Sequence, residues 1–425
     1  MSTVQSPPAR PSRGPLTDLL TGGGRSRRVL WLVLGVLVLV SAVRVVSGEQ
    51  ELTSSSTMAA ALLLAVPIAL AALGGLFSER AGVVNIGLDG MMILGTWGAG
   101  WAGYQWGWGA AVLGGLVFGA VGGLLHAIAT VTFGVDHVVS GVAINILAAG
   151  IVRFLSELIY IDNPAGGGAA QSPPLSSQPP EFSLPVLSSG PDLLGSLEER
   201  QWFLVSDLAG VLRGLTSDVG VLTLIAVAMI PVSYLVLWRT AFGLRLRACG
   251  ENPAAADSLG VPVYRLKYTA VVISGALAGL GGVFLVFIAN IYREGQTGGR
   301  GFIGLAALIF GNWRPGGLAA GAGLFGFADA LQLRSQTAVM ALLLLIAVLL
   351  AGVAVYQAVR RKLTQAVLAG VFAGAALVGF LTIDRLPEGI VSFTPHLATL
   401  LVLSLASQRL RMPKADGLVY RRGEG

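Results

Sequence analysis

The polar side chains that could do chemistry in this sequence are few, and most of them lie inside or beside long apolar runs. Six of them stand out: Asn85, Asp89, Ser140, Asn145, Asn290 and Arg300. Asn85 and Asp89 are four residues apart, a spacing that places both on one face of a helix. A charge at the centre of a bilayer costs at least about 2.5 kcal/mol on insertion scales, so such groups normally face a bundle interior or water. We therefore expect these six residues to line a path for a polar solute.

A structural role is the alternative for each of these residues. Asp89 could pair with a basic group such as Arg80 or Arg300, and Asn85 and Asn145 could form hydrogen bonds between helices. The glycines of "TGGRGF", which precede an apolar piece, could aim backbone N–H groups at a ligand or could simply allow close packing.

The sequence provides no catalytic or metal-binding set. Its single cysteine, Cys249, has no partner for a disulfide, and the histidines at positions 126, 137 and 396 are scattered. Each lysine is followed by Tyr, Leu or Ala, so the phosphate-binding motif G-x-x-x-x-G-K-[ST] is absent. We expect no cofactor in this chain and no ATP hydrolysis by it.

Composition assigns the chain to the membrane proteins. It has 54% hydrophobic and 12% charged residues and a mean hydropathy of +0.76, against roughly 25% charged residues in soluble domains. The net charge is +6, but the arginines cluster at the ends of apolar runs, which indicates membrane topology rather than nucleic-acid binding. Trp97, Trp101, Trp106 and Trp108 are expected to form an interfacial belt.

The apolar runs predict an all-α integral membrane protein with about ten spanning helices. The expected spans are 29–46, 58–77, 86–103, 108–131, 138–160, 219–238, 267–290, 338–357, 363–383 and 395–408. Two shorter pieces, 302–310 and 318–331, flank "GNWRPGG" and predict a broken or re-entrant helical hairpin that must be packed inside protein.

Charges at the ends of these runs predict the orientation. Residues 1–28 are expected to be a disordered cytoplasmic tail, followed by a permease domain over 29–408 and a basic cytoplasmic tail over 409–425. The loop 161–218, which carries far more acidic than basic residues, is then extracytoplasmic, and its Pro-, Gly- and Ser-rich first part is expected to be mobile. The basic loop 239–266 lies in the cytoplasm, as do both termini.

The cytoplasmic loop contains "GLRLRACGENPAAADSLGV", which predicts a short docking helix. Asn252 can cap a helix, Pro253 suits its first position, and Gly260 ends it. Two turns are too short to be stable alone, so a partner or the flanking chain must hold them. A tight connector is the alternative. The candidate docking residues are Arg245, Arg247, Glu251, Asn252, Pro253, Ala254, Ala255, Ala256, Asp257, Ser258, Leu259 and Gly260.

Four motifs carry a family resemblance. "GGLFSERAGVVNIGLDGMMILGTW", "DHVVSGVAINILAAGIVRF", "GLRLRACGENPAAADSLGV" and "GGRGFIGLAALIFGNWRPGGLAAGAGLFGFADALQLR" resemble permease subunits of bacterial ABC importers of the ribose and branched-chain amino acid superfamily. They are most similar to the second permease of nucleoside importers that work with a basic-membrane-protein-type lipoprotein. The tail "MPKADGLVYRRGE" resembles the ending of that subgroup, and the resemblance covers roughly residues 58–422.

The resemblance implies a type II-like importer permease in the bacterial cytoplasmic membrane. It implies a second permease, an ATPase subunit that binds ATP and Mg²⁺, and an extracytoplasmic lipoprotein that delivers the substrate. Residues 250–260 then match the coupling helix. Two alternatives stay open: the same machine carrying a pentose or another small polar solute, and an ion-coupled secondary transporter.

Overall fold

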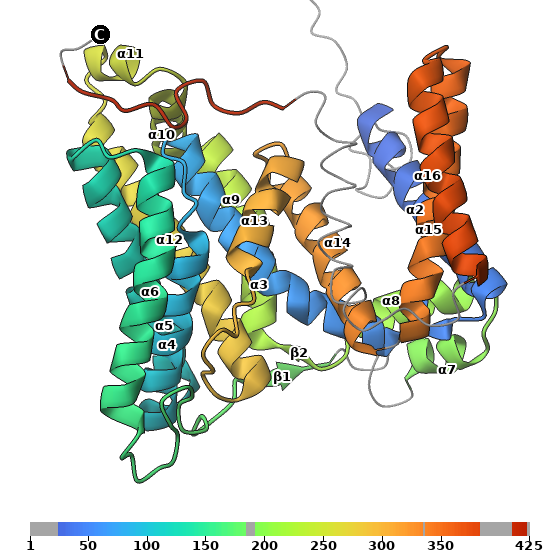
Figure 1. Cartoon of the computed structure of the whole chain (residues 1–425), viewed down its shortest axis with the longest axis horizontal. Coiled ribbons are helices and arrows are strands. Elements are labelled where there is room, and N and C mark those ends of the chain that lie inside the picture. Colours follow the sequence, from blue (N-terminus) through green and yellow to red (C-terminus); the bar gives the residue numbers. More distant parts are fainter. Residues whose placement is uncertain (1–23, 184–191, 335, 383–409, 423–425) are drawn as a thin grey trace, which may run out of the picture.

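The computed structural model describes residues 24–183, 192–334, 336–382 and 410–422, and most of them are helical (Figure 1). The helices are α2 (Gly24–Ser47), α3 (Ser55–Arg80), α4 (Leu88–Trp106), α5 (Trp108–Ala127), α6 (His137–Tyr160), α7 (Leu193–Glu199), α8 (Val205–Gly214), α9 (Val221–Arg239), α10 (Ala241–Glu251), α11 (Pro253–Ser258), α12 (Val263–Ala289), α13 (Arg300–Phe310), α14 (Pro315–Arg334), α15 (Gln336–Val359) and α16 (Leu363–Thr382). A 3₁₀ turn, η1 (Gln50–Leu52), and a π-helical turn, η2 (Ile128–Thr132), complete the helical structure. The all-α membrane class is confirmed.

Seven of the described helices are long and apolar enough to cross a membrane. They are α3, α5 extended through η2, α6, α9, α12, the part of α15 from Met340, and α16. The expected count of ten is not confirmed. The expected span 395–408 lies outside the described residues, α4 is less apolar than these seven, and on α2 only the shorter apolar stretch Leu34–Ser47 is found. Most of α4 is buried, so its surroundings are protein rather than lipid. Helix α2 already begins at Gly24, inside the expected tail 1–28, since arginines favour helix.

The centre of the molecule is a bundle of α3, α4, α5 and α12 whose backbones approach closely at glycines. Gly119 on α5 lies against α12, where a Cβ on Gly275 would be 2.3 Å from the carbonyl oxygen of Gly119. A Cβ on Gly279 would be 2.2 Å from the oxygen of Gly115. Small residues at four-residue spacing are a typical contact between membrane helices. Helix α4 joins the same contact, because a Cβ on its Gly95 would be 2.3 Å from the Gly279 Cα.

The tryptophans of α4 do not form the expected belt. Trp97 is buried, stacks on Trp101 at 6.1 Å between ring centres, and donates from Nε1 to the Ser156 hydroxyl at 3.0 Å. Trp106, at the end of α4, is exposed. The expectation was wrong for Trp97 because α5, α6 and α12 enclose this helix.

The broken hairpin is formed by α13 and α14. With 11 residues, α13 is about 16 Å long and cannot cross the roughly 30 Å apolar layer. Helix α14 has 20 residues and is longer than the sequence predicts. The turn between them is tight, since a Cβ on Gly311 would be 2.1 Å from the Leu318 nitrogen. The prediction of a piece too short to span the membrane therefore holds for α13 only.

The described parts of the loop 161–218, residues 161–183 and 192–218, are more ordered than expected. The first part lies against the end of α12: Ser172 N donates to the Tyr292 oxygen at 3.1 Å and Leu175 N to the Asn290 oxygen at 2.9 Å. Leu175 is buried, and strand β1 (Glu181–Phe182) pairs antiparallel with β2 (Val219–Gly220). Backbone pairing and one buried leucine thus fix a stretch whose composition favours mobility.

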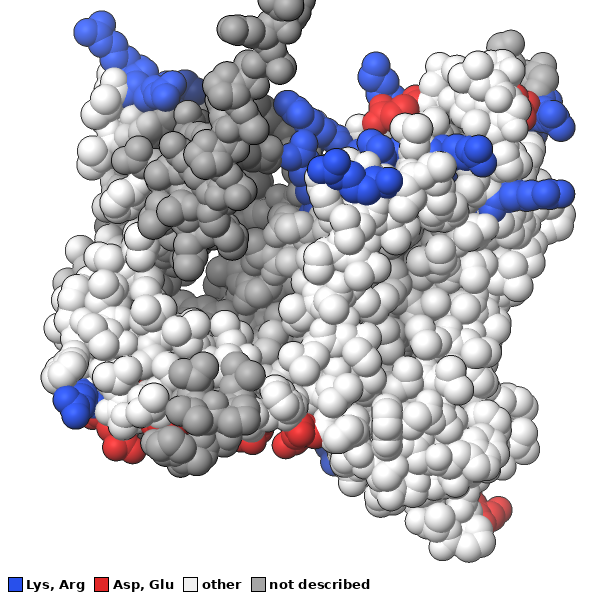
Figure 2. Space-filling view, turned by 180° about the vertical axis from the view of Figure 1, so that it is seen from behind, with Lys and Arg blue, Asp and Glu red and all other residues white. Residues whose placement is uncertain are grey.

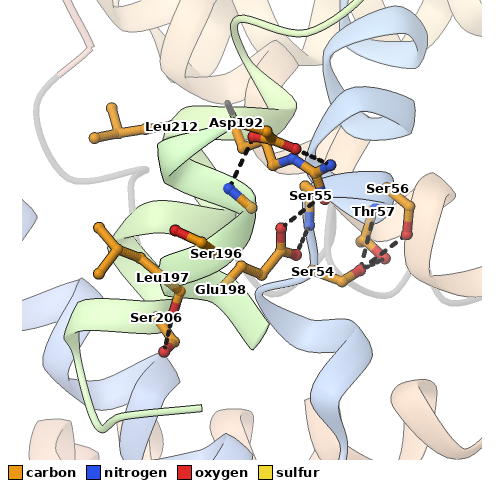
Figure 3. A network of polar contacts seen from close by, with 12 residues as sticks. Ser54, Ser55, Ser56, Thr57, Asp192, Ser196, Leu197, Glu198, Ser206 and Leu212 are labelled. Carbon is orange, nitrogen blue, oxygen red and sulfur yellow. Dashed lines mark hydrogen bonds and ion pairs between the residues drawn. The ribbon is translucent and has the colours of Figure 1, made fainter. Parts of the chain in front are cut away.

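The second part of this loop forms α7 and α8, which are fastened to the start of α3 (Figure 3). Glu198 Oε1 accepts from the Ser55 nitrogen at 2.7 Å, and Arg213 bridges Asp192 at 2.5 Å and Glu198 at 3.2 Å. Close by, the buried Asp207 carboxylate pairs with Arg44 of α2 at 2.8 Å. The network joins the loop to α2 and α3.

The two ends of the molecule differ in charge. In Figure 2 the visible Lys and Arg side chains gather mainly at one end, an almost uncharged band lies in the middle, and most of the visible Asp and Glu side chains lie at the other end. The basic end carries α10 and α11, and the acidic end carries α7, α8 and the β-ribbon (Figure 1). We call them the basic end and the acidic end.

Candidate functional site

Asp89 lies where two helices begin. It is in the first turn of α4, and its carboxylate accepts from the Gly301 nitrogen at 2.9 Å and the Thr297 hydroxyl at 3.4 Å. The N-terminus of α13 carries partial positive charge, so the carboxylate stabilises it. A Cβ on Gly301 would be 2.4 Å from the Asp89 Cα, so only glycine fits there. The Gly301 N–H in "TGGRGF" therefore already donates to the Asp89 side chain.

Asn145 and Asn85 fasten the short segment between α3 and α4, residues 81–87. Asn145 accepts from the Gly90 nitrogen at 2.7 Å and donates to the Ile86 oxygen at 3.1 Å. The fully buried Asn85 donates to the Ser274 hydroxyl at 2.8 Å and accepts from the Gly87 nitrogen at 3.1 Å. Hydrogen bonds between helices, the structural alternative, are thus present at both residues.

Ser140 reaches the same segment through a buried histidine. His126 Nε2 is 2.9 Å from the Val84 carbonyl oxygen, which can only accept, so this nitrogen carries the proton. The Ser140 hydroxyl then donates to His126 Nδ1 at 2.9 Å. His137 Nδ1 accepts from the Val84 nitrogen at 3.2 Å. His126 and His137 thus hydrogen-bond to the two backbone groups of Val84.

Arg300 lies beside Asp89 but its ionic partner is Asp329. It contacts the Asp329 carboxylate at 3.4 Å and donates to the Thr297 oxygen at 3.3 Å. Arg80 donates to the Trp313 carbonyl at 2.7 Å. The carboxylate of Asp89 is stabilised by the start of α13, rather than by direct pairing with Arg80 or Arg300 as the structural alternative supposed.

The structure therefore brings five of the six candidate path residues to one place and leaves one apart. Asn290 caps the acidic end of α12 in a left-handed conformation (φ 59°), is exposed, and accepts from Gln178 at 2.6 Å. The cluster contains residues that the sequence did not single out, namely Thr297, Ser274 and His126. Asp329 could have been found, because it and Arg300 carry opposite charges on the two arms of an antiparallel hairpin, within about one helical turn of each other in distance from its turn.

Further charged residues lie on α6 beyond Asn145, toward the acidic end of the molecule. Arg153 and Glu157 are four residues apart and share one face. Arg153 pairs with Glu157 and with Glu294 of the loop after α12, both at 2.7 Å, and all three side chains are 42–47% exposed. A half-exposed charged cluster on a spanning helix is poorly suited to lipid. We call it the α6 charged face.

At the basic end, the predicted docking helix is present as α11. Ala255 N donates to the Asn252 side chain at 3.0 Å, Pro253 occupies the first position and Gly260 has a φ of 78°. The helix ends at Ser258, one residue earlier than expected. Its buried side holds Ala256, whereas Leu259 just beyond it is 84% exposed. The exposed residues Ala254, Ala255, Ser258 and Leu259 offer an accessible surface for a partner.

The polar approach to α11 is itself a helix, α10. On it Arg245 is exposed, but Arg247 donates to the Leu237 oxygen at 2.9 Å and lies over the Trp238 ring. Arg247 therefore joins α10 to α9. Cys249 is buried, which raises the pKa of its thiol to about 11. Among the described residues, no group of histidine, cysteine and acidic residues could hold a metal ion.

Known proteins resemble the chain over most of its length. The guanosine ABC transporter permease protein NupQ of Bacillus subtilis is 39% identical over 282 residues, 64% of this chain and 81% of the relative. The nucleoside ABC transporter permease protein NupC of Lactococcus lactis is 31% identical over 368 residues, 84% of this chain and 94% of the relative.

A third relative is named for a different substrate. The putative glucose ABC transporter permease protein TsgC13 of Haloferax volcanii is 34% identical over 297 residues, 68% of this chain and 79% of the relative. No solved structure matches the chain. The family model described as branched-chain amino acid transport system / permease component matches residues 57–353, which include the cluster at Asp89, the α6 charged face and α11. The chain therefore belongs to this family of transport permeases, as the four sequence motifs indicated.

Proposed function

We propose that this chain is the transmembrane permease of an ATP-driven ABC importer that moves nucleosides across the bacterial cytoplasmic membrane. The observation that carries the proposal is α11, a capped helix with an exposed surface at the basic end of a chain without a phosphate-binding loop. Two relatives named as guanosine and nucleoside permeases supply the substrate class.

In this proposal the basic end lies in the cytoplasm, where positive charge accumulates in membrane proteins. A separate ATPase subunit, which binds ATP and Mg²⁺, contacts α11 through Ala254, Ala255, Ser258 and Leu259. Arg245 and Glu251, both exposed on α10, flank this surface. Closing of the ATPase then moves α11, and with it the helices to which α11 is attached.

The α6 charged face is proposed to line the path together with a second permease. Two of its three half-exposed charges, Arg153 and Glu157, are on a spanning helix, so water or a polar partner is a more favourable neighbour than lipid. The face leads from the acidic end to Asn145 and the cluster at Asp89. An extracytoplasmic binding lipoprotein would dock at the acidic end and release substrate at this entrance.

A sugar is the second candidate substrate, because a similar identity connects the chain to a putative glucose permease. Ion-coupled transport has less support. The acids in or beside the spans are already engaged: Asp89 by the α13 N-terminus, Asp329 by Arg300 and Glu157 by Arg153. These three carboxyl groups are therefore not available for a proton or sodium relay.

The substrate can be tested with right-side-out membrane vesicles that contain the full complex and internal ATP. Labelled guanosine, adenosine, cytidine, uridine, ribose and glucose are offered in parallel. We expect uptake of at least one nucleoside, with unlabelled nucleosides competing and glucose not competing. Uptake of glucose or ribose alone would contradict the nucleoside proposal and favour the sugar.

A further inference from the structure

The C-terminal residues 410–422 form an extended segment that crosses the basic end of the molecule (Figure 1). It begins near the hairpin turn, where Arg411 N donates to the Asn312 side chain at 2.6 Å. It ends at α11, where Arg422 pairs with Asp257 at 3.1 Å. The segment therefore joins the α13–α14 turn to the docking helix, which are distant in sequence.

The middle of the segment is inserted into the protein. Ala415 and Asp416 are buried, and Ala415 N donates to the Gly250 oxygen at the end of α10 at 2.8 Å. Gly82 lies beneath it, since a Cβ there would be 3.1 Å from the Ala415 oxygen. Gly82 belongs to the segment between α3 and α4 that leads to Asp89. The tail thus contacts the structure around the candidate path directly.

Asp416 adds a polar anchor. Burial, followed by the neighbouring Glu79 of α3, raises the pKa of the Asp416 carboxyl to about 9, although Lys267 and Arg80 act in the opposite direction. Neither Asp416 oxygen accepts a hydrogen bond from a donor of the described chain. Two carboxyl groups in contact can form a hydrogen bond only if one keeps its proton. Glu79 also accepts from Trp313 Nε1 at 2.5 Å. The Glu79–Asp416 pair is therefore connected to the α13–α14 turn.

The far end of the segment packs on the buried side of the docking helix. The Tyr420 ring is 5.7 Å from the ring of Tyr264 at the start of α12. It also packs on the cluster of Cys249, Ala256, Val263 and Leu266. Since Ala256 is the buried residue of α11, Tyr420 and Arg422 support the helix from beneath and from one side.

We propose that residues 410–422 are a strap that positions α11 and connects it to the α13–α14 turn and to the segment before α4, so that movement of α11 reaches the candidate path. A helix of six residues cannot keep its place unaided. The strap supplies an ion pair, an aromatic contact and a buried anchor, and it stays attached while the transporter works. This inference rests on the proposed function, because it concerns how work from the ATPase is transmitted.

The test uses the full complex of this chain, the second permease, the ATPase and the binding protein in proteoliposomes. The variant Tyr420→Ala with Arg422→Ala removes the support of α11, and Lys414→Ala with Leu418→Ala changes two exposed residues of the same strap as a control. We expect uptake per ATP hydrolysed to fall roughly tenfold in the first variant, which is the effect of losing a typical energetic coupling between two sites. The control should match the unmodified complex. An unchanged ratio in the first variant would overturn the proposal.

A second measurement keeps the test valid if that variant does not assemble. Asp257→Cys with Arg422→Cys, in a Cys249→Ala background, allows a short bis-maleimide to join strap and helix. A strap that stays attached predicts that the cross-linked complex still takes up substrate at the rate of the untreated one. Loss of uptake on cross-linking would show that the strap must detach. Absence of ATP-dependent uptake in the unmodified complex would instead contradict the proposed function itself.

Discussion

At the scale of single residues, the sequence predicted some of the polar groups that lie inside the protein, but not what they contact. Asn85, Asp89 and Asn145 stand out because amides and a carboxylate are costly in an apolar run. Their partners are mostly backbone groups of the segment 81–90 and of the start of α13. Sequence spacing cannot reveal such partners, since they depend on how two broken helices meet.

Replacement of Asp89 separates a capping role from a substrate role. Asp89→Ala removes the acceptor for the Gly301 nitrogen and should lower the free energy of unfolding by about 1–2 kcal/mol, as for other lost caps. Asp89→Asn keeps an acceptor oxygen and should recover most of that loss. Denaturant unfolding of the purified chain in detergent measures both. If Asp89→Ala is as stable as the unmodified chain yet transports poorly, Asp89 serves the substrate instead.

The buried carboxyl of Asp416 predicts a dependence of stability on pH. Its pKa is raised from 3.8 to about 9 in the folded chain, so folding takes up a proton. This contribution to the free energy of unfolding is largest below pH 4 and is lost as the pH rises towards 9. Thermal unfolding should therefore occur at a lower temperature at pH 9 than at pH 6. Asp416→Asn should reduce the difference, and an equal difference in this variant would refute the assignment.

At the scale of elements, strongly apolar runs and helix caps were predictable, whereas helices of mixed composition were not. The caps of α11 follow from Asn252, Pro253 and Gly260, which act locally. Helix α10 was missed because it is polar and follows α9 after a single residue. Its Arg247 is held by Leu237 and Trp238 at the end of α9. The glycine spacing on α5 and α12 is visible in the sequence and could have predicted their contact.

The glycine contact between α5 and α12 predicts a sharp response to bulk. Gly279→Val places side-chain atoms where the Gly115 oxygen and the Gly119 Cα of α5 already lie. Overpacking of this kind costs about 1–3 kcal/mol, so the purified variant should unfold at lower denaturant concentration. Gly150→Val on α6 is the matched control, because nothing lies within 4 Å of its Cβ position. Equal stability of the two variants would show that α12 can move away without cost.

At the scale of the whole molecule, the charges of the two ends predict its orientation in the membrane. Cys249 cannot report it, because its thiol is buried and has a raised pKa. In a Cys249→Ala background, a cysteine in place of exposed Glu199 should react with a membrane-impermeant maleimide in intact cells, and one in place of exposed Ser258 should react only after permeabilisation. The reverse pattern would invert the proposed topology.

The architecture as a whole combines a permease fold, confirmed by family membership, with the exposed helix α11 and a sequence without the phosphate-binding motif G-x-x-x-x-G-K-[ST]. Composition was sufficient to predict the membrane class, and the charges at the two ends were sufficient to predict an orientation. The order within the loop 161–218 and the insertion of the tail could not be predicted. Both depend on contacts between residues far apart in the chain, such as Glu198 with Ser55 and Ala415 with Gly250.

The central claim is that ATP hydrolysis on the α11 side drives transport through this chain. Transport assays in proteoliposomes that contain the complete complex measure it directly. The binding protein and a labelled nucleoside are placed on the acidic side, and ATP is placed on the basic side. The account predicts accumulation only with hydrolysable ATP on the basic side, unchanged when ionophores remove proton and sodium gradients. Accumulation that needs no ATP and follows an imposed ion gradient would contradict it.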